Sequence, residues 1–380
     1  MSSVLRIFTT SSSDYHFSFI KKHKWNNDNA GKILAEQCVD KKYDSVVEVV
    51  VDNFPNSTDV IYDLLLNCND DIFFFIEYSL HELHDSILTL IKQKASTTNI
   101  FFCCHYEPYT ISSFEYLKKE IYTELPDLKN IWFISCNLKV NELTTTPTNL
   151  NVAAFDFFSG YFVYGIKECL VPLAGQSILP KKDFLCLNLK PRPNRKFFID
   201  LLHKHEVYEN GYISFGGNTL EGTKFDKEAR RSLGANQIVI PTFFDISPWV
   251  NNVYFEVVMD DVYSFNKHSN DENYIYMSEK VYRTIYNKLP MMVYGKPEYL
   301  KYLQALGFKT YNNFFDETYD VIEDWRSRGR MIADQVKRFC QKPDTEKQQW
   351  FEQAKEIAEF NYNHLLKDEN LCRLFLNKIV

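Results

Sequence analysis

Apolar residues in the first half of the chain come in short runs rich in β-branched and aromatic side chains, a pattern typical of buried strands. Stretches with helical spacing, at residues 83–94 and 114–124, separate the later runs. Connections of this length favour parallel neighbours, so we expect a series of βαβ units. The expected strands are residues 5–8, 46–51, 72–77, 100–104 and 131–136.

A second alternation of strands and helices begins near residue 184. After Asp316 the pattern is helical almost to the end, with a break at Pro343, after which Asp344 is expected to cap a further helix. We therefore predict an α/β fold of two Rossmann-like domains with a C-terminal helical extension that braces the two lobes. The second half is expected to contain strands at 184–189, 212–215, 253–259 and 291–294 and helices at 196–205, 279–288 and 299–306.

The length of the chain, 380 residues, suits two domains better than one core. Residues 144–150 and 172–182 are poor formers of helix or strand, which places a linker near them. The predicted organisation is a first domain over 1–150, a linker over 151–182, a second domain over 183–320 and terminal helices over 321–380.

Composition narrows the classes of protein. Apolar residues make up 45% and aromatic residues 16% of the chain, which excludes a disordered or fibrous protein. The start of the chain does not resemble a signal peptide and no apolar run reaches membrane-spanning length, so we expect a cytoplasmic protein without membrane insertion. The nine cysteines lack the paired spacing of a zinc site, and we expect reduced thiols. A net charge of −7 argues against a surface that coats nucleic acid but allows a local basic cleft.

The densest cluster of cations lies in the segment NLKPRPNR, between an expected strand and an expected helix. Ligands of open α/β sheets bind at this end of the strands. The two prolines stiffen the loop, so Arg192 loses little entropy on binding, and Lys190 and Arg195 lie close to it in sequence. This arrangement suits a diphosphate. The alternative is a solvated loop whose cations pair with nearby acids.

A second candidate site begins at Ser278, a natural N-cap for the helix that follows. The N-terminus of a helix attracts anions, which would help Lys280 to hold a phosphate. Glu279 is then a candidate acceptor for ribose hydroxyls, and Arg283 is one turn further along the same helix. The alternative is an ordinary capped surface helix with an internal ion pair.

Two weaker signals accompany these. Gly295 follows an expected strand and allows the backbone to approach a nucleotide closely, although glycine at this place is usually turn chemistry alone. The adjacent acids in Asn69-Asp70-Asp71 and Met259-Asp260-Asp261 are more typical of solvated or capping residues than of a metal site, so no metal is expected.

In order, the KPRPNR loop, SFGG, the SEKVYR helix and the segment VYGKPEYLKYLQALGFKTY resemble the C-terminal half of glycosyltransferases of phages and large viruses. More distantly, they are similar to the nucleotide-sugar lobe of GT-B fucosyltransferases. The resemblance covers about residues 184–320. It implies a nucleotide-diphosphate sugar as donor, an acceptor-side first domain, Arg192 and Lys280 on the diphosphate, and Glu279 on the ribose.

The reaction that the resemblance implies is transfer of a sugar to an acceptor hydroxyl, with cations stabilising charge on the leaving phosphate and no metal required. An inverting reaction needs a base for the acceptor proton. Candidates at strand ends of the first half are Glu77, His105 and Glu107, with Asp14 and His16 as weaker ones. Each of them also has an ordinary structural interpretation as a polar residue at a strand end.

The acceptor has no motif of its own. Three acceptors stay open: a hydroxymethylated base in double-stranded DNA, a cytosolic or lipid-linked glycan, and a small metabolite. The resemblance to phage enzymes favours DNA, with the host cytoplasm as the location, whereas the acidic net charge counts against it. A non-catalytic nucleotide-binding or nucleic-acid-binding protein on the same scaffold is the main rival. The absence of the G-x-G-x-x-G and P-loop patterns disfavours an oxidoreductase and an NTPase.

Overall fold

The structure is a computed structural model that describes residues 6–8, 47–51, 72–76, 89, 93–94, 99–104, 119, 131–140, 151–156, 180–188, 192–215, 218–219, 247–260, 274–367 and 374–375. The chain divides into two compact units. The first comprises Met1–Tyr161, Ser264–Tyr276 and Leu371–Val380, and the second comprises Phe162–Tyr263 and Met277–Asn370. Each unit contains a largely parallel sheet, which confirms the α/β class.

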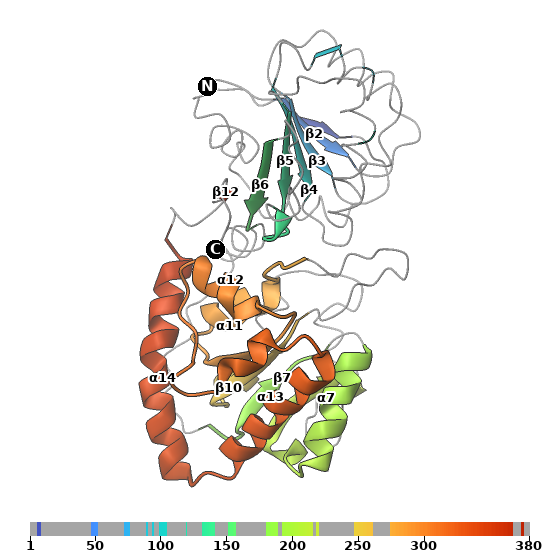
Figure 1. Cartoon of the computed structure of the whole chain (residues 1–380). Coiled ribbons are helices and arrows are strands. Elements are labelled where there is room, and N and C mark those ends of the chain that lie inside the picture. Colours follow the sequence, from blue (N-terminus) through green and yellow to red (C-terminus); the bar gives the residue numbers. More distant parts are fainter. Residues whose placement is uncertain are drawn as a thin grey trace. The chain divides into compact units, whose positions relative to one another are not determined.

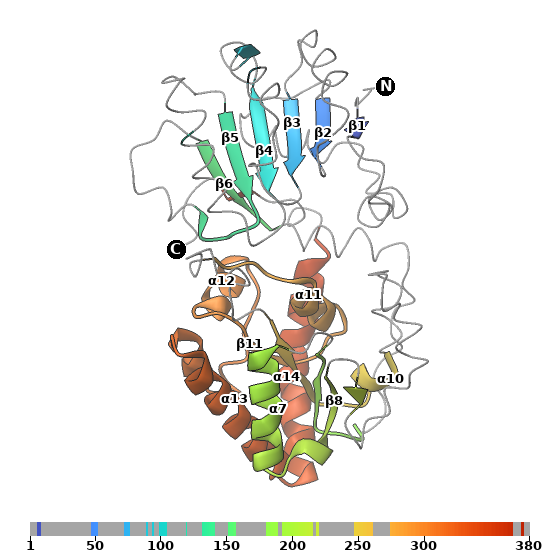
Figure 2. The ribbon, with the colours of Figure 1, turned by 90° about the vertical axis from the view of Figure 1, so that its right-hand side faces the viewer.

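The first unit is built on a seven-stranded sheet in the order β1-β2-β3-β4-β5-β6-β12 (Figure 2). The strands from β1 to β6 run parallel, and β12 is antiparallel to β6. The described strands follow chain order without a reversal, whereas a doubly wound sheet reverses its order at a switch point. The strands are β1 (Arg6–Phe8), β2 (Val47–Val51), β3 (Ile72–Ile76), β4 (Ile100–Cys104), β5 (Ile131–Ser135), β6 (Asn151–Phe155) and β12 (Leu374–Phe375).

Strand β6 lies where the sequence predicted the start of a linker. Its residues pair with β5, and the side chain of Asn151 donates a hydrogen bond to the carbonyl of Ile131 at 3.2 Å. Ala153 and Ala154 are fully buried. Alanine has little intrinsic preference for strands, so pairing within the sheet decides the conformation of this run. The predicted linker of 151–182 is therefore wrong over its first residues.

A buried asparagine closes the carboxyl end of β5. The backbone N–H of Asn137 donates to Ser135 Oγ at 3.0 Å, and its Oδ1 accepts from the N–H of Lys139 at 3.0 Å. The same Oδ1 accepts from the N–H of Ile275 at 3.0 Å, and the N–H of Leu138 donates to the carbonyl of Ile275 at 2.7 Å. These bonds attach a segment 138 residues away along the chain to the end of the strand.

The second unit contains a five-stranded sheet in the order β11-β10-β7-β8-β9. All neighbours are parallel except β8 and β9. The chain runs from β7 outward through β8 and then returns to the other side of β7 for β10, so the strand order reverses between β7 and β10. The carboxyl ends of these two strands form a topological switch point, where open sheets bind ligands. The strands are β7 (Phe184–Cys186), β8 (Gly211–Phe215), β9 (Asn218–Thr219), β10 (Phe255–Met259) and β11 (Met291–Tyr294).

Helices cover this second sheet on both faces. Helices α7 (Pro193–Lys204) and α13 (Trp325–Cys340) pack together on one side, and α11 (Glu279–Tyr286) packs with α14 (Asp344–Leu365) on the other (Figure 1). Shorter elements complete the unit. They are α10 (Ser247–Val250), α12 (Tyr299–Ala305) and the 3-10 turns Tyr208–Asn210 and Glu317–Val321.

The terminal helices belong to the second unit. Helix α13 contacts α7 and β11, and α14 contacts α11, whereas the sequence predicted helices that brace two lobes. The indole of Trp350 lies among the rings of Phe255, Phe315 and Phe339, with centroids 4.9–6.0 Å apart. Pro343, and not Asp344 as predicted, is the N-cap of α14, because the helix already includes Asp344 in its first turn.

Two buried polar contacts fix α14 in place. Lys347 Nζ lies 2.8 Å from Asp183 Oδ1, just before β7, and both side chains are only 8% exposed. Asn361, fully buried, accepts from the N–H of Lys309 and donates to the carbonyl of Lys309, each at 2.8 Å.

The predicted helices at 83–94 and 114–124 lie almost entirely outside the described residues. The residues that are described in these two ranges, Thr89, Gln93, Lys94 and Lys119, are helical.

Candidate functional site

The predicted helix start at Ser278 is confirmed. Ser278 has an extended backbone and is fully buried, and its Oγ accepts a hydrogen bond from the N–H of Lys280 at 3.3 Å. Helix α11 therefore begins at the carboxyl edge of the second sheet, where β10 ends at Met259. The positive end of its dipole is directed toward this edge, which favours an anion there.

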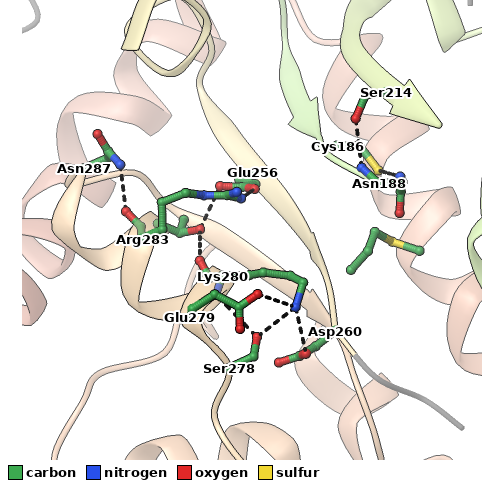
Figure 3. Close-up of polar contacts among 12 residues, drawn as sticks. Cys186, Asn188, Ser214, Glu256, Asp260, Ser278, Glu279, Lys280, Arg283 and Asn287 are labelled. Carbon is green, nitrogen blue, oxygen red and sulfur yellow. Dashed lines mark hydrogen bonds and ion pairs between the residues drawn. The ribbon is translucent and has the colours of Figure 1, made fainter. Parts of the chain in front are cut away.

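Lys280 is the centre of a charged cluster at this edge (Figure 3). Its Nζ lies 3.0 Å from Glu279 Oε1 and 3.8 Å from Asp260 Oδ1. Burial favours the neutral amine, but the two carboxylates prevail and raise the pKa of Lys280. Burial also favours the neutral form of Glu279, and the charge and hydrogen bond of Lys280 prevail there, lowering the pKa of Glu279. Both groups are therefore ionised at neutral pH.

A second cation, Arg195, lies near Lys280. It comes from the first turn of α7 and is 4% exposed, and its Nη2 donates to the carbonyl of Met259 at 3.3 Å. Its charge opposes protonation of Lys280, which places the two cations within electrostatic reach of each other. Arg192 is the N-cap of α7 by its backbone, and its side chain makes no capping hydrogen bond. The two predicted anion sites thus converge on one edge through Arg195 and Lys280.

Asp260 is a member of the cluster that the sequence did not identify. Adjacent acids at a strand end were predicted to be solvated or capping residues, but Asp260 is 1% exposed and bonds to side chains. Its Oδ2 accepts a hydrogen bond from Tyr299 Oη at 2.5 Å, and its Oδ1 faces Lys280. The prediction of a solvated residue is wrong because the apolar strand β10 carries Asp260 into the packed edge of the sheet, where partners compensate its burial.

Gly295 leaves room for the ring of Tyr299. A Cβ at Gly295 would lie 2.6 Å from Tyr299 Cδ2, so the absence of a side chain makes room for this ring. The sequence predicted that Gly295 allows close approach of a nucleotide. The close approach is real, but the group that occupies the space is a side chain of the protein that bonds to Asp260.

Arg283 is engaged in the interior of the unit. Its Nη2 bonds to Glu256 Oε1 on β10, and Thr284 Oγ1 donates to Glu256 Oε2 at 2.7 Å. The side chains of Arg283 and Glu256 are 6% and 1% exposed. Figure 3 shows this pair farther from the start of α11 than Lys280 and Asp260. Arg283 therefore anchors α11 to β10, and its charge also helps to lower the pKa of Glu279 in the cluster around Lys280.

Buried amides flank the basic loop. Asn188 and Asn194 are 0% and 1% exposed. The N–H of Asn188 donates to Ser214 Oγ at 2.9 Å, and its Nδ2 donates to Cys186 Sγ at 3.4 Å. Within the described part of the chain, Asn188 Oδ1 and both polar side-chain atoms of Asn194 have no hydrogen-bond partner. Buried polar atoms are normally satisfied, so a ligand or water is needed at these positions.

Several predicted site residues lie outside the described residues. They are Lys190 of the basic loop, the candidate bases Glu77, His105 and Glu107, and the weaker candidates Asp14 and His16. In the described ranges no group of three or more His, Cys, Asp or Glu is placed to hold a metal ion. The described cysteines Cys103, Cys136, Cys186 and Cys340 are free thiols.

No protein-family model matches the chain, and no curated protein matches it. None of the helices in the described ranges combines the length and the apolar character that crossing a membrane takes. Function must therefore be inferred from the site itself.

Proposed function

We propose that this chain is a glycosyltransferase that moves a sugar from a nucleotide-diphosphate sugar to an acceptor hydroxyl. The observation that carries the proposal is the position of Lys280, in the first turn of α11 at the switch point of the second sheet, with Arg195 nearby. A helix N-terminus and two cations at a strand-order reversal are the elements of a diphosphate site. We extend the proposal to a Rossmann-like fold for the second unit, whose strand order reverses between β7 and β10.

In the proposed reaction the cations act on the leaving group. As the bond from sugar to phosphate breaks, negative charge grows on the diphosphate, and preorganised cations stabilise that charge more than they stabilise the substrate. Glu279 is 26% exposed and ionised, so its carboxylate can accept a hydrogen bond from a ribose hydroxyl. Glu77, His105 and Glu107 are proposed as candidates for the base that takes the acceptor proton.

The first experiment measures nucleotide binding. Calorimetric titration with UDP, GDP, CDP and ADP, together with their sugar conjugates, should identify one nucleotide that binds. Lys280→Ala should weaken that binding about 10- to 100-fold, because a charge-assisted hydrogen bond is worth about 1.5–3 kcal/mol. Lys355→Ala is the matched control: Lys355 on α14 also pairs with a glutamate, at 2.8 Å, and its loss should leave affinity unchanged. Equal affinity of wild type and Lys280→Ala for every nucleotide would refute the proposed site.

The second experiment measures turnover. With the selected nucleotide sugar as donor, release of nucleoside diphosphate is followed with duplex DNA containing hydroxymethylated bases, with lipid-linked or capsule-type glycans, and with small hydroxyl compounds. We propose hydroxymethylated DNA as the acceptor, and turnover with another class in place of DNA would reassign it. Tight nucleotide binding with no turnover on any acceptor would instead support the non-catalytic binding protein.

A further inference from the structure

Lys280 has two carboxylate partners that differ in freedom. Glu279 is 26% exposed and can turn away from Lys280 toward a ligand. Asp260 is 1% exposed, so its position is fixed by the packing around it. The two distances follow this difference, since Nζ lies 3.0 Å from Glu279 but 3.8 Å from Asp260. Asp260 is therefore the carboxylate whose position beside the cation is fixed.

A hydrogen bond from Tyr299 fixes the position of Asp260. Tyr299 is 2% exposed, and its hydroxyl donates to the oxygen of Asp260 that faces away from Lys280. Its ring rests against Gly295. The next two residues are also fixed, because the N–H groups of Leu300 and Lys301 donate to the carboxylate of Asp320 at 3.0 and 3.3 Å. The tyrosine hydroxyl therefore keeps Asp260 at its distance from the ammonium.

We infer that Asp260 and Tyr299 are positioning residues that limit how tightly Lys280 holds a diphosphate, so that the nucleoside diphosphate product can leave. The inference rests on the proposed function. A carboxylate close to the cation repels the anion that the cation attracts, and this repulsion acts on the product, which carries more negative charge than the donor. A site with unopposed cations would retain its product, and release would limit turnover.

The test uses two conservative variants with opposite expected effects. Asp260→Asn keeps an oxygen that accepts from Tyr299 and removes the negative charge, so the selected nucleoside diphosphate should bind about tenfold more tightly. Inorganic pyrophosphate should follow the same trend, and the unphosphorylated nucleoside should not change. Steady-state kinetics should show kcat and KM for the donor both reduced, because product release becomes slower.

Tyr299→Phe keeps the carboxylate of Asp260 and removes only the hydroxyl that keeps this carboxylate at a distance from Lys280. The carboxylate can then approach Lys280 more closely, so the nucleoside diphosphate should bind a few-fold more weakly. A purely structural role would change affinity in the same direction in both variants. Circular dichroism and thermal unfolding verify that each variant is folded.

Three outcomes overturn the inference: weaker or unchanged diphosphate binding by Asp260→Asn, unchanged or tighter binding by Tyr299→Phe, or equal change for the nucleoside and its diphosphate. If Asp260→Asn does not fold, Tyr299→Phe decides alone, with weaker diphosphate binding as support. Failure of the proposed function is seen separately, since in that case Lys280→Ala would not change nucleotide affinity.

Discussion

At the scale of single residues, we predict that a side chain at Gly295 would destabilise the fold, because the ring of Tyr299 occupies the space beside it. Gly295→Ala places a methyl group 2.6 Å from the ring of Tyr299, a distance that real contacts do not reach, so the ring must move. Overpacking of this kind costs about 1–3 kcal/mol of folding free energy. Because the ring carries the hydroxyl that bonds to Asp260, nucleotide affinity should change as well. Urea denaturation measures the first effect, and calorimetric titration the second.

A double-mutant cycle tests whether the loss of folding free energy in Gly295→Ala comes from the ring of Tyr299. If the added methyl group acts through the ring, Gly295→Ala should cost much less in a Tyr299→Leu background, where no ring occupies the space. Additive effects of the two substitutions would show that Gly295 is required for another reason, such as the turn that follows β11.

The raised pKa of Asp320 should make the free energy of unfolding depend on pH. Burial raises its pKa from 3.8 to about 6, against the hydrogen bonds that it accepts from Leu300 and Lys301. Since the folded state then binds the proton more tightly than the unfolded chain, this group stabilises the fold below pH 4. That contribution is lost as the pH rises to about 6, by at most about 3 kcal/mol. Asp320→Asn should remove this part of the pH slope when urea denaturation is compared between pH 4 and pH 7. If the free energy of unfolding changed equally with pH in the wild type and in Asp320→Asn, the raised pKa of Asp320 would be contradicted.

Residue chemistry could be predicted from the sequence where it is local. The cap at Ser278 and the charges of Glu279 and Lys280 follow from three adjacent positions. The partners that come from other strands and helices could not be predicted in this way. Glu256, inside an apolar strand, and Asp260, at its end, gain their roles only when β10 packs beside α11. A charged residue within an otherwise apolar strand was the available signal for Glu256, since such a residue must find a buried partner.

At the scale of elements, Asn361 holds α14 to the segment that follows α12. Asn361→Ala removes two buried hydrogen bonds and leaves the N–H and carbonyl of Lys309 unsatisfied, which should cost about 2–3 kcal/mol. Asn363→Ala is the matched control, because Asn363 lies on the same helix and is exposed. Its loss should change the free energy of unfolding by less than about 0.5 kcal/mol. Similar costs for both substitutions would contradict the role of the Lys309 contact.

Individual elements were more predictable than their order. Short apolar runs located strands β1 to β5 of the first unit to within one residue at each end, because a buried parallel strand must be apolar on both faces, whereas β6 and β12 were not predicted. The order of the strands has no such local signature. Only the structure places β10 beside β7 and so creates the switch point at which Lys280 lies.

At the scale of the whole molecule, the chain passes between the two units four times. The predicted domains were continuous stretches of sequence and could not describe this, because residues 264–276 and 371–380 belong to the same unit as Met1–Tyr161. The predicted last domain of 321–380 accordingly divides, with α13 and α14 in the second unit and β12 in the first.

Removal of residues 371–380 tests this division. The truncation deletes β12, which pairs with β6 at the edge of the first sheet. An uncovered edge strand favours association between molecules, so light scattering should detect self-association that the full chain lacks. Nucleotide affinity should stay unchanged because the proposed site belongs to the second unit. Loss of nucleotide binding in a folded, monomeric truncation would show that the two units are not independent in this respect.

The hydrogen bonds between Asn137 and Ile275 have a mechanical consequence. The chain leaves the second unit three residues after Asp260 and returns one residue before Ser278. Ile275 is fastened to the end of β5 in the first unit, so only two residues separate that anchor from the cap of α11. A connection of two residues allows little extension, so a displacement at the end of β5 would reach the start of α11 and Lys280 through these hydrogen bonds and the short stretch of backbone that follows them.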